Sequence, residues 1–243
     1  MKQRTLRDDD QLIPYQIQHK RTVTRRIHLR VAPDGSLLVI APRRMSQRSI
    51  HQTLQDRVHK VARFLAGAQV RLRETPRSEY VSGEPHLFLG RHYRLELAES
   101  TARSGRVGLT DDAIRVECAD HRPVRVQKLL ESWYRNEAKN LYAARLAAIA
   151  SRAQWVKSEL PPIRLRKMKR TWGSCSARGI ITLNTRLIRT PLECVDYVIA
   201  HELCHLQEMN HSRAFYKLQD QLCPDWQTTR THLRKKAHIY LAE

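Results

Sequence analysis

Residues 201–211, with the sequence HELCHLQEMNH, hold three histidines and a glutamate at intervals that suit a metal ion. Positions four apart on a helix share a face, so His201 and His205 can aim both imidazoles at one point. Zinc binds imidazole nitrogen at about 2.0–2.1 Å, and two such ligands form half of a tetrahedral site. Glu202 lies about 100° further around the helix, where it can reach a water held by the metal and serve as its general base.

His211, six residues after His205, is the third predicted ligand. With this composition the HExxH pattern is expected in roughly three of every hundred shuffled chains, and this extra histidine lowers that to about two in a thousand. A left-handed cap at Asn210 would end the helix and turn His211 back toward the metal. Three protein ligands leave one position open, as catalytic zinc requires. Glu208 competes for the third place, but it would have to bend back within the same helix.

The histidine spacing also matches the metzincin pattern HExxHxxGxxH. However, Glu208 occupies the glycine of that pattern, and no methionine follows His211 to form the Met-turn of metzincins. We therefore exclude that subclass.

The helix that carries the motif has a marked start. Thr190, Pro191 and Glu193 have the types and spacing of an N-cap, a proline in the first helical turn and a capping-box glutamate. No glycine or proline interrupts residues 192–209. We therefore expect a helix of about four turns that carries the first two histidines and the glutamate.

The rest of the chain alternates strand and helix signals. The period-two alternation of strands covers 15–41, 86–98, 106–119, 163–170 and 180–184. Helical spacing covers 46–74, 124–152 and, in three pieces, most of 190–243. The sequence predicts an α+β protein with two domains: a strand-rich region with one helix at 1–120, and a mainly helical domain at 121–243. We find no internal repeat.

The chain is strongly basic, with 44 Lys and Arg residues against 24 Asp and Glu residues and a net charge of +20. Residues 121–180 alone hold 14 basic and 3 acidic residues. Such an excess attracts polyanions, so the basic surface is predicted to bind nucleic acid or a nucleotide. Arginine used as a general solubilising residue explains the same composition equally well.

The cysteines and the apolar segments predict a location. The five cysteines form no CxxC pair, which disfavours a disulfide framework and favours a reducing cytoplasm. The first 20 residues lack the apolar run of a secretion signal. No stretch reaches the ~18 uninterrupted apolar residues of a membrane span. We expect a cytoplasmic protein with no membrane partner.

Short motifs surround the HELCH segment. They are Trp172-Gly173-Ser174-Cys175, Leu183-Asn184, Asp196-Tyr197-Val198 and Asn210-His211-Ser212. With them, residues 171–215 closely resemble the YgjP-like metal-dependent hydrolases, which are cytoplasmic zincins related to the SprT-like and WLM-type proteases. The resemblance implies a zincin-like catalytic domain behind the strand-rich region. It also implies one Zn²⁺ bound by His201, His205 and His211, with Glu202 as catalytic base. The family is named for peptidases, a name that does not establish a natural substrate, and we expect a peptide or protein substrate.

Hydrolysis also needs a group that stabilises the negative charge that develops on the substrate oxygen. Tyr216, Arg213 and Arg170 are candidates by their position in the sequence. Trp172 precedes a glycine that permits a tight turn near the site, although a core aromatic residue is the alternative. A strand before the motif helix can pair with an extended substrate through its main chain.

Three functions fit these observations. The first is a zinc-dependent metallopeptidase. The second is a zinc-dependent hydrolase of a phosphate-containing substrate, such as a nucleoside triphosphate, with the basic run RLRKMKR at 164–170 clamping the phosphates. The third is a basic nucleic-acid-associated protein with a structural zinc, but such a site is closed by four ligands and would leave Glu202 unexplained.

Overall fold

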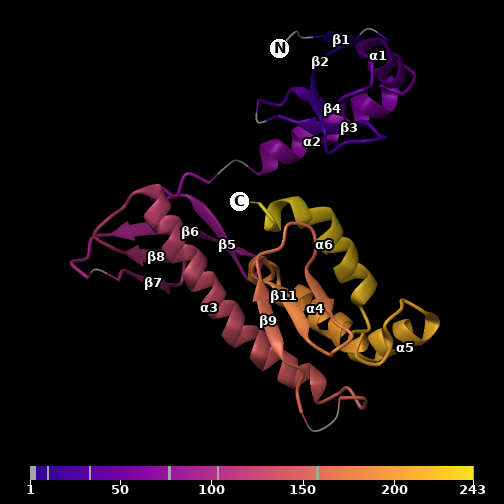
Figure 1. The fold of residues 1–243 in the computed structure, drawn as a ribbon. Coiled ribbons are helices and arrows are strands. Elements are labelled where there is room, and N and C mark those ends of the chain that lie inside the picture. The colour runs from indigo at the N-terminus through magenta and orange to yellow at the C-terminus, as the bar shows by residue number, and fades with distance from the viewer. Residues whose placement is uncertain are drawn as a thin grey trace. The chain divides into compact units, whose positions relative to one another are not determined.

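The computed structural model describes residues 4–9, 11–32, 34–75, 78–102, 104–156 and 159–242. The chain forms two compact units, Met1–Pro76 and Arg77–Glu243, and each has its own hydrophobic core. Strands dominate the first half and helices the second (Figure 1), so the predicted α+β class is confirmed. The boundary predicted near residue 120 lies inside the second unit.

The first unit is a four-stranded sheet with two helices. In the spatial order β1-β2-β4-β3, its strands are β1 (Arg4–Asp8), β2 (Gln11–Lys20), β4 (Leu37–Pro42) and β3 (His28–Val31). The central strands β2 and β4 are parallel, and both outer pairs are antiparallel.

The predicted helix at 46–74 is two helices, α1 (Gln47–Gln55) and α2 (Val58–Glu74). Arg57 leaves the helical conformation, with φ −129° and ψ 24°. Both helices contribute apolar side chains to the core of the first unit: Ile50, Leu54, Val58, Val61 and Leu65. The apolar side chains spaced along one helical face of the sequence therefore pack into a single core, although the helix is interrupted at Arg57.

The second unit begins with a sheet of the same design. In the spatial order β5-β6-β8-β7, its strands are β5 (Pro85–Phe88), β6 (Arg91–Ala98), β8 (Ala113–Glu117) and β7 (Arg106–Leu109). Again the central pair is parallel and both outer pairs are antiparallel. The two sheets repeat one topology that the sequence did not reveal, because topology depends on apolar alternation and turns, which unrelated sequences can share.

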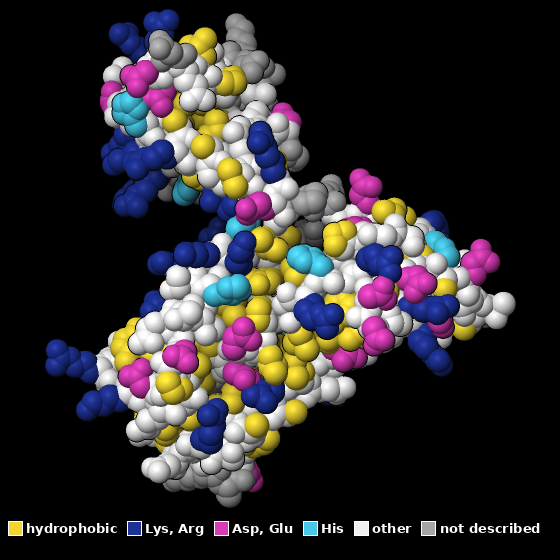
Figure 2. Space-filling view, turned by 180° about the vertical axis from the view of Figure 1, so that it is seen from behind, with side chains coloured by type: hydrophobic (Ala, Val, Ile, Leu, Met, Phe, Trp, Pro, Cys, Tyr) yellow, Lys and Arg dark blue, Asp and Glu magenta, His cyan; other side chains and the backbone are white. Residues whose placement is uncertain are grey.

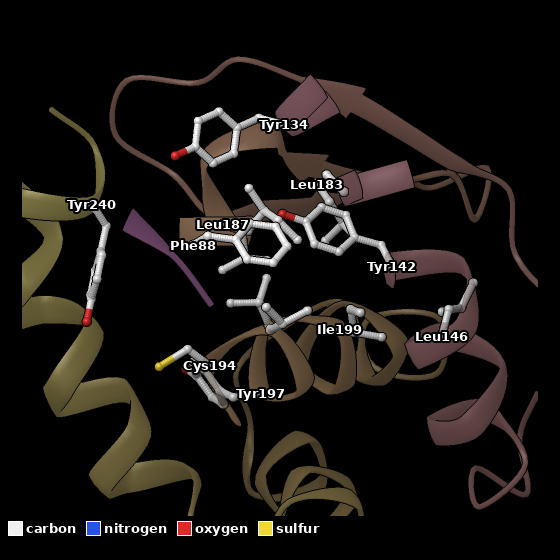
Figure 3. Close-up of a cluster of buried hydrophobic side chains, with 14 of the residues drawn as sticks. Phe88, Tyr134, Tyr142, Leu146, Leu183, Leu187, Cys194, Tyr197, Ile199 and Tyr240 are labelled. Atoms are coloured by element: carbon white, nitrogen blue, oxygen red, sulfur yellow. The ribbon is translucent and has the colours of Figure 1, made fainter. Parts of the chain in front are cut away.

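Helix α3 (Pro123–Ala150) joins this sheet to the rest of the second unit. Tyr134 donates a hydrogen bond to the Leu87 carbonyl of β5 (2.8 Å), and Tyr142 donates one to the Asn184 carbonyl (3.1 Å). Figure 3 shows both tyrosines among the apolar side chains of this core. Strands β5–β8 and helix α3 share one core, so the residues on either side of residue 120 pack together.

A three-stranded sheet follows α3. In the spatial order β10-β11-β9, its strands are β10 (Gly173–Cys175), β11 (Ile181–Asn184) and β9 (Ile163–Arg166). β9 is shorter than the predicted strand at 163–170, because the buried Asn184 amide accepts a hydrogen bond from Met168 N–H and donates one to the Met168 carbonyl. These bonds turn the chain and bring β10 to the edge of the sheet.

The remaining elements are helical: η1 (Thr185–Arg189), α4 (Leu192–Cys204), α5 (Arg213–Leu222) and α6 (Trp226–Tyr240). The capping box predicted at Thr190 is not formed, because Pro191 is the N-cap residue of α4 and no side chain caps it. Thr190 is buried, and its hydroxyl donates to the Leu187 carbonyl of η1 (2.8 Å).

Across the described residues, no helix combines the length and the apolar character that a membrane crossing needs.

Candidate metal centre

Three imidazole rings converge at the C-terminal end of α4. His201 lies on α4, His205 is its C-cap residue, and His211 lies in the loop before α5. The ring centroids are 4.8 to 5.0 Å apart. One ring nitrogen of each histidine lies within 4.8 Å of the others. The structure thus brings together the three histidines that the sequence singled out.

The turn that returns His211 to the other two differs from the predicted one. The Glu208 N–H donates to the Cys204 carbonyl at 2.9 Å, so the chain turns directly after α4. Asn210 does not adopt a left-handed conformation. Its carbonyl accepts a hydrogen bond from the Ser212 N–H at 2.8 Å, and the Ser212 hydroxyl caps α5. The next helix therefore begins at Arg213, two residues after the third histidine.

Phe215 forms an apolar floor under the three rings. Its ring centroid lies 4.7 to 4.9 Å from that of each histidine, and the residue is fully buried. Packing against one aromatic side chain restricts all three imidazoles together. The only hint in the sequence is an aromatic residue four positions after His211.

The donor atoms suit a metal ion. His201 Nε2 lies 3.1 Å from His211 Nε2, close to the roughly 3.3 Å between two nitrogens that bind one tetrahedral zinc. His205 Nδ1 contacts the Glu208 carbonyl at 3.1 Å, which orients the ring and leaves Nε2 for a metal. The Glu208 carboxylate, the predicted competitor, is not part of this cluster in the described part of the chain.

Burial keeps the imidazoles of His201 and His205 neutral. It lowers the pKa of His201 to about 4, and the neighbouring His205 and His211 add to this effect. Burial also lowers the pKa of His205. Neutral imidazole is the form that binds metals, so the cluster is ready to bind an ion at neutral pH.

Glu202 is buried next to His201. The residue is 4 % exposed, and its Oε2 makes no hydrogen bond with any described residue. Burial raises the pKa of this carboxyl to about 8. Gly173 of β10 packs against it: a Cβ atom at that position would lie 2.5 Å from Glu202 Oε1. Glycine therefore leaves the room that the glutamate side chain occupies.

Gln219 of α5 is a second buried polar residue at this site. It is fully buried, and neither side-chain atom makes a well-aligned hydrogen bond with a described residue. Its amide nevertheless raises the pKa of His201, so it lies against that ring. An amide in this place can orient the imidazole from behind. No pattern in the sequence indicates this role, because a glutamine on an amphipathic helix is usually exposed.

The other four residues predicted near the site have different surroundings. Tyr216 stacks on His211, with ring centroids 6.3 Å apart and an interplanar angle of 26°. Trp172 is half-buried and packs edge-to-face on a tyrosine of α6. Arg170 and Arg213 are exposed and make no hydrogen bond or ion pair with any residue that the structure describes. Tyr216 thus adjoins the histidines, whereas Trp172 packs on the core.

A pocket of about 210 Å³ opens beside the histidine cluster. It is lined by Tyr197, His201, His211, Tyr216, Trp226 and Arg230. Tyr197 appeared in the sequence only as part of a family motif without an assigned role, and Trp226 and Arg230 were not singled out. They come from α4 and α6, so only the packing of these helices brings them together.

The basic run at 164–170 contributes to a different pocket. Lys167 forms an ion pair with Glu131 at 2.7 Å. The pocket that both residues line has a volume of about 350 Å³ and includes Arg186 and Arg189, but none of the three histidines lines it.

Comparison with known proteins assigns the chain to a family. A family model described as a YgjP-like metallopeptidase domain matches residues 25–236. The chain belongs to the YgjP-like family. The resemblance in residues 171–215 is therefore confirmed and extends over most of the chain. Membership of the YgjP-like family supports a metal-dependent peptidase.

Two solved structures similar to this YgjP-like chain are zymogens of metallopeptidases. Abylysin from Pyrococcus abyssi is 21 % identical with a TM-score of 0.33, and the match covers 41 % of this chain and 93 % of that one. Jannalysin from Methanocaldococcus jannaschii is 20 % identical with a TM-score of 0.30, covering 39 % and 93 %. No curated protein matches the chain.

Proposed function

We propose that this protein is a zinc-dependent metallopeptidase in which His201, His205 and His211 hold one zinc ion and Glu202 is the general base. The convergence of three imidazoles beside a buried carboxyl group is the observation that carries this proposal. A structural zinc would need a fourth protein ligand. No fourth His, Cys, Asp or Glu joins the cluster among the described residues.

The chemistry divides between the ion and the chain. When bound, zinc lowers the pKa of a coordinated water and polarises the substrate carbonyl. Glu202 accepts a proton from the attacking water and delivers it to the leaving amine. The high pKa of the metal-free carboxyl falls when a dication binds nearby, which gives the ionised form that a base needs.

An extended peptide is the substrate that best suits the surroundings of Glu202. β10 is the edge strand of its sheet, and its first residue, Gly173, packs directly on the glutamate. A peptide that pairs with this edge through its main chain would lie close to the proposed base. Such pairing needs no particular side chains, so it fits a peptidase with broad sequence tolerance.

No specific observation favours the two alternative functions. Lys167 of the basic run lines a pocket without the histidines, which weakens the proposed clamp for phosphates. Nothing in the comparisons indicates a nucleic acid partner, so binding through the basic surface stays a prediction. A cytoplasmic location also stays a prediction, and the five free cysteines agree with it.

Metal analysis and paired assays test the proposal. Purified protein should contain about one zinc per chain, and His205→Ala should lose it. Glu202→Gln should keep the zinc but cleave an unfolded protein about 10²–10⁴-fold more slowly. Glu193→Gln, an exposed change at the other end of α4, is the matched control and should leave both unchanged. Full activity of Glu202→Gln would refute the role of Glu202 as the general base. Hydrolysis of nucleoside triphosphates without peptide cleavage would favour the phosphate alternative.

A further inference from the structure

We propose that the pocket beside the histidine cluster binds a carboxylate group of the peptide substrate through Arg230. This inference rests on the proposed peptidase function and specifies which substrates it prefers. The carboxylate has two possible sources, the C-terminus of the peptide or the side chain of an acidic residue next to the cleaved bond.

The pocket adjoins the proposed reaction centre. His201 and His211 form part of its lining, so a group bound there lies against two of the three proposed ligands. Its volume of about 210 Å³ is enough for one side chain or for a terminal carboxylate with its Cα atom.

Two stacked aromatic rings build one wall of the pocket. The rings of Tyr216 and Trp226 have centroids 5.1 Å apart and an interplanar angle of 12°. Trp226 is 8 % exposed, and its indole N–H donates to Asp220 Oδ1 at 2.7 Å. A stack held at both ends is rigid, so this wall exists before any substrate arrives.

Arg230 supplies an uncompensated positive charge at this wall. Its guanidinium carbon lies 5.8 Å from the centroid of the Trp226 ring. It forms no ion pair with any carboxylate in the part of the chain that the structure describes. Arg230 lines the pocket together with His201 and Tyr197, so its charge borders the same space.

These features select a carboxylate. A guanidinium group binds a carboxylate through two parallel hydrogen bonds, which fixes orientation as well as charge. Arg230 is itself exposed, and the stacked aromatic wall shields one side of that interaction from water. A neutral group would leave Arg230 without a partner, and a basic group would be repelled by it.

Cleavage assays on matched peptides test the preference. Three peptides differ only in the C-terminal residue, which follows the cleaved bond. The first ends in glutamate with an amidated C-terminus, the second in glutamine with a free C-terminus, and the third in glutamine with an amidated C-terminus. Wild type should cleave at least one of the first two about 10–100-fold better, in kcat/KM, than the neutral third. The better of the two identifies the source of the carboxylate.

Two variants assign the preference to Arg230. Arg230→Gln should abolish the discrimination, and Arg230→Lys should restore part of it, because the charge returns without the planar fork. Lys235→Gln removes one charge from the exposed, opposite side of α6 and should keep the wild-type preference. Equal discrimination in wild type and Arg230→Gln, or equal loss in Lys235→Gln, would overturn the proposal.

A binding measurement separates this inference from the proposed function. In metal-free full-length protein, the indole ¹H–¹⁵N signal of Trp226 should shift on titration with the carboxylate peptides and not with the neutral one. The shift should vanish in Arg230→Gln. This result needs no turnover, so it stands if the protein cleaves none of the peptides. Identical shifts with all three peptides would show that the pocket does not recognise a carboxylate.

Discussion

Sheet β1–β4 and sheet β5–β8 have the same strand order and the same directions, but they belong to different cores. The first sheet packs on α1 and α2, which follow it directly in the chain. The second packs on α3 and shares its core with α4, the helix that carries His201 and Glu202. One topology thus forms a self-contained unit in one place and part of the scaffold of the proposed metal site in the other.

The turn between β5 and β6 shows how the second sheet reaches that scaffold. The N–H groups of Leu89 and Gly90 donate to the carbonyls of Ile188 and Arg189 at the end of η1 (2.9 and 3.1 Å). Gly90 also packs on Pro191, the N-cap residue of α4. The sheet therefore holds the start of α4, the helix of the proposed metal site, through backbone contacts that do not depend on particular side chains.

The first unit is the more basic of the two for its length. Residues 1–76 hold 16 Lys and Arg against 6 Asp and Glu, whereas residues 77–243 hold 28 against 18. Figure 2 shows such basic side chains, in dark blue, gathered on one side of this unit. A fold with its own core tolerates such a surface, because the charges remain solvated and the core is unaffected. The comparison shows that the shared strand topology lets each sheet form a core. The helices that each sheet contacts determine whether it supports the proposed metal site.

Truncating a buried residue at the equivalent position of each sheet should give the largest difference between the two units. Leu37 in β4 and Ile114 in β8 are both 0 % exposed, and each pairs with the last residue of the preceding strand. Leu37→Ala and Ile114→Ala should each cost about 3–4 kcal/mol. Only Ile114→Ala should weaken zinc binding, because its core includes α4.

Denaturation followed by two signals can separate these effects. All four tryptophans lie after residue 76, so tryptophan fluorescence follows the second unit and circular dichroism follows both. Zinc affinity is measured by competition with a chelator. Equal zinc loss in Leu37→Ala would contradict the independence of the two cores.

The pH dependence of the metal-free protein should also distinguish the units. Burial raises the pKa of Glu202 in the folded protein to about 8, from 4.5 for an unperturbed glutamate. Between these values the unfolded chain releases a proton that the folded chain keeps, so stability falls as pH rises. Glu202→Gln should therefore stabilise the metal-free second unit by about 2–4 kcal/mol at pH 8 and have little effect at pH 4.

Urea unfolding monitored by tryptophan fluorescence at both pH values checks this expectation. A stability difference between wild type and Glu202→Gln that does not change with pH would contradict the buried, protonated carboxyl.

Two glycines offer a matched test of the attachment to α4. Gly35 and Gly90 have nearly equal φ values, +81° and +80°. A Cβ atom at Gly35 would meet only a Gln69 side chain at 3.9 Å, whereas at Gly90 it would lie 2.8 to 3.1 Å from Pro191. Gly35→Ala should cost about 1 kcal/mol and Gly90→Ala about 2–3 kcal/mol, because the second adds a clash to the same backbone strain.

Thermal or urea unfolding measures both glycine variants, with zinc retention as a second readout. Gly90→Ala should also lower zinc affinity. Equal costs for the two variants would show that the contact with Pro191 has no energetic weight.

The smallest expected effect concerns the link between α3 and α4. Arg145 and Asp196 form a two-point ion pair at 2.6 Å, with side chains 32 % and 26 % exposed. Asp196→Asn should cost about 1 kcal/mol, since the pair is partly screened by solvent. Glu131→Gln, which breaks the more exposed pair with Lys167, should change stability by less than about 0.5 kcal/mol. A larger loss of stability in Glu131→Gln than in Asp196→Asn would contradict this expectation.

Local spacing in the sequence predicted much of the proposed site. The four-residue interval between His201 and His205 sets a shared helix face wherever that helix lies. Strand alternation and helical stripes likewise predicted most elements and the mixed class. The helix start at Thr190 was predicted wrongly, because its hydroxyl bonds to η1, whose presence no local pattern indicated.

By itself, then, the sequence determined which residues can bind a metal, on which kind of element they lie, and which family the chain resembles. Those properties depend on side-chain chemistry and on intervals of a few residues. Only the tertiary structure decided that Phe215 and Gln219 support the rings, that Gly173 packs on Glu202, and that Arg230 faces a pocket. These neighbours come from separate elements, and their meeting depends on long-range packing that no short interval encodes.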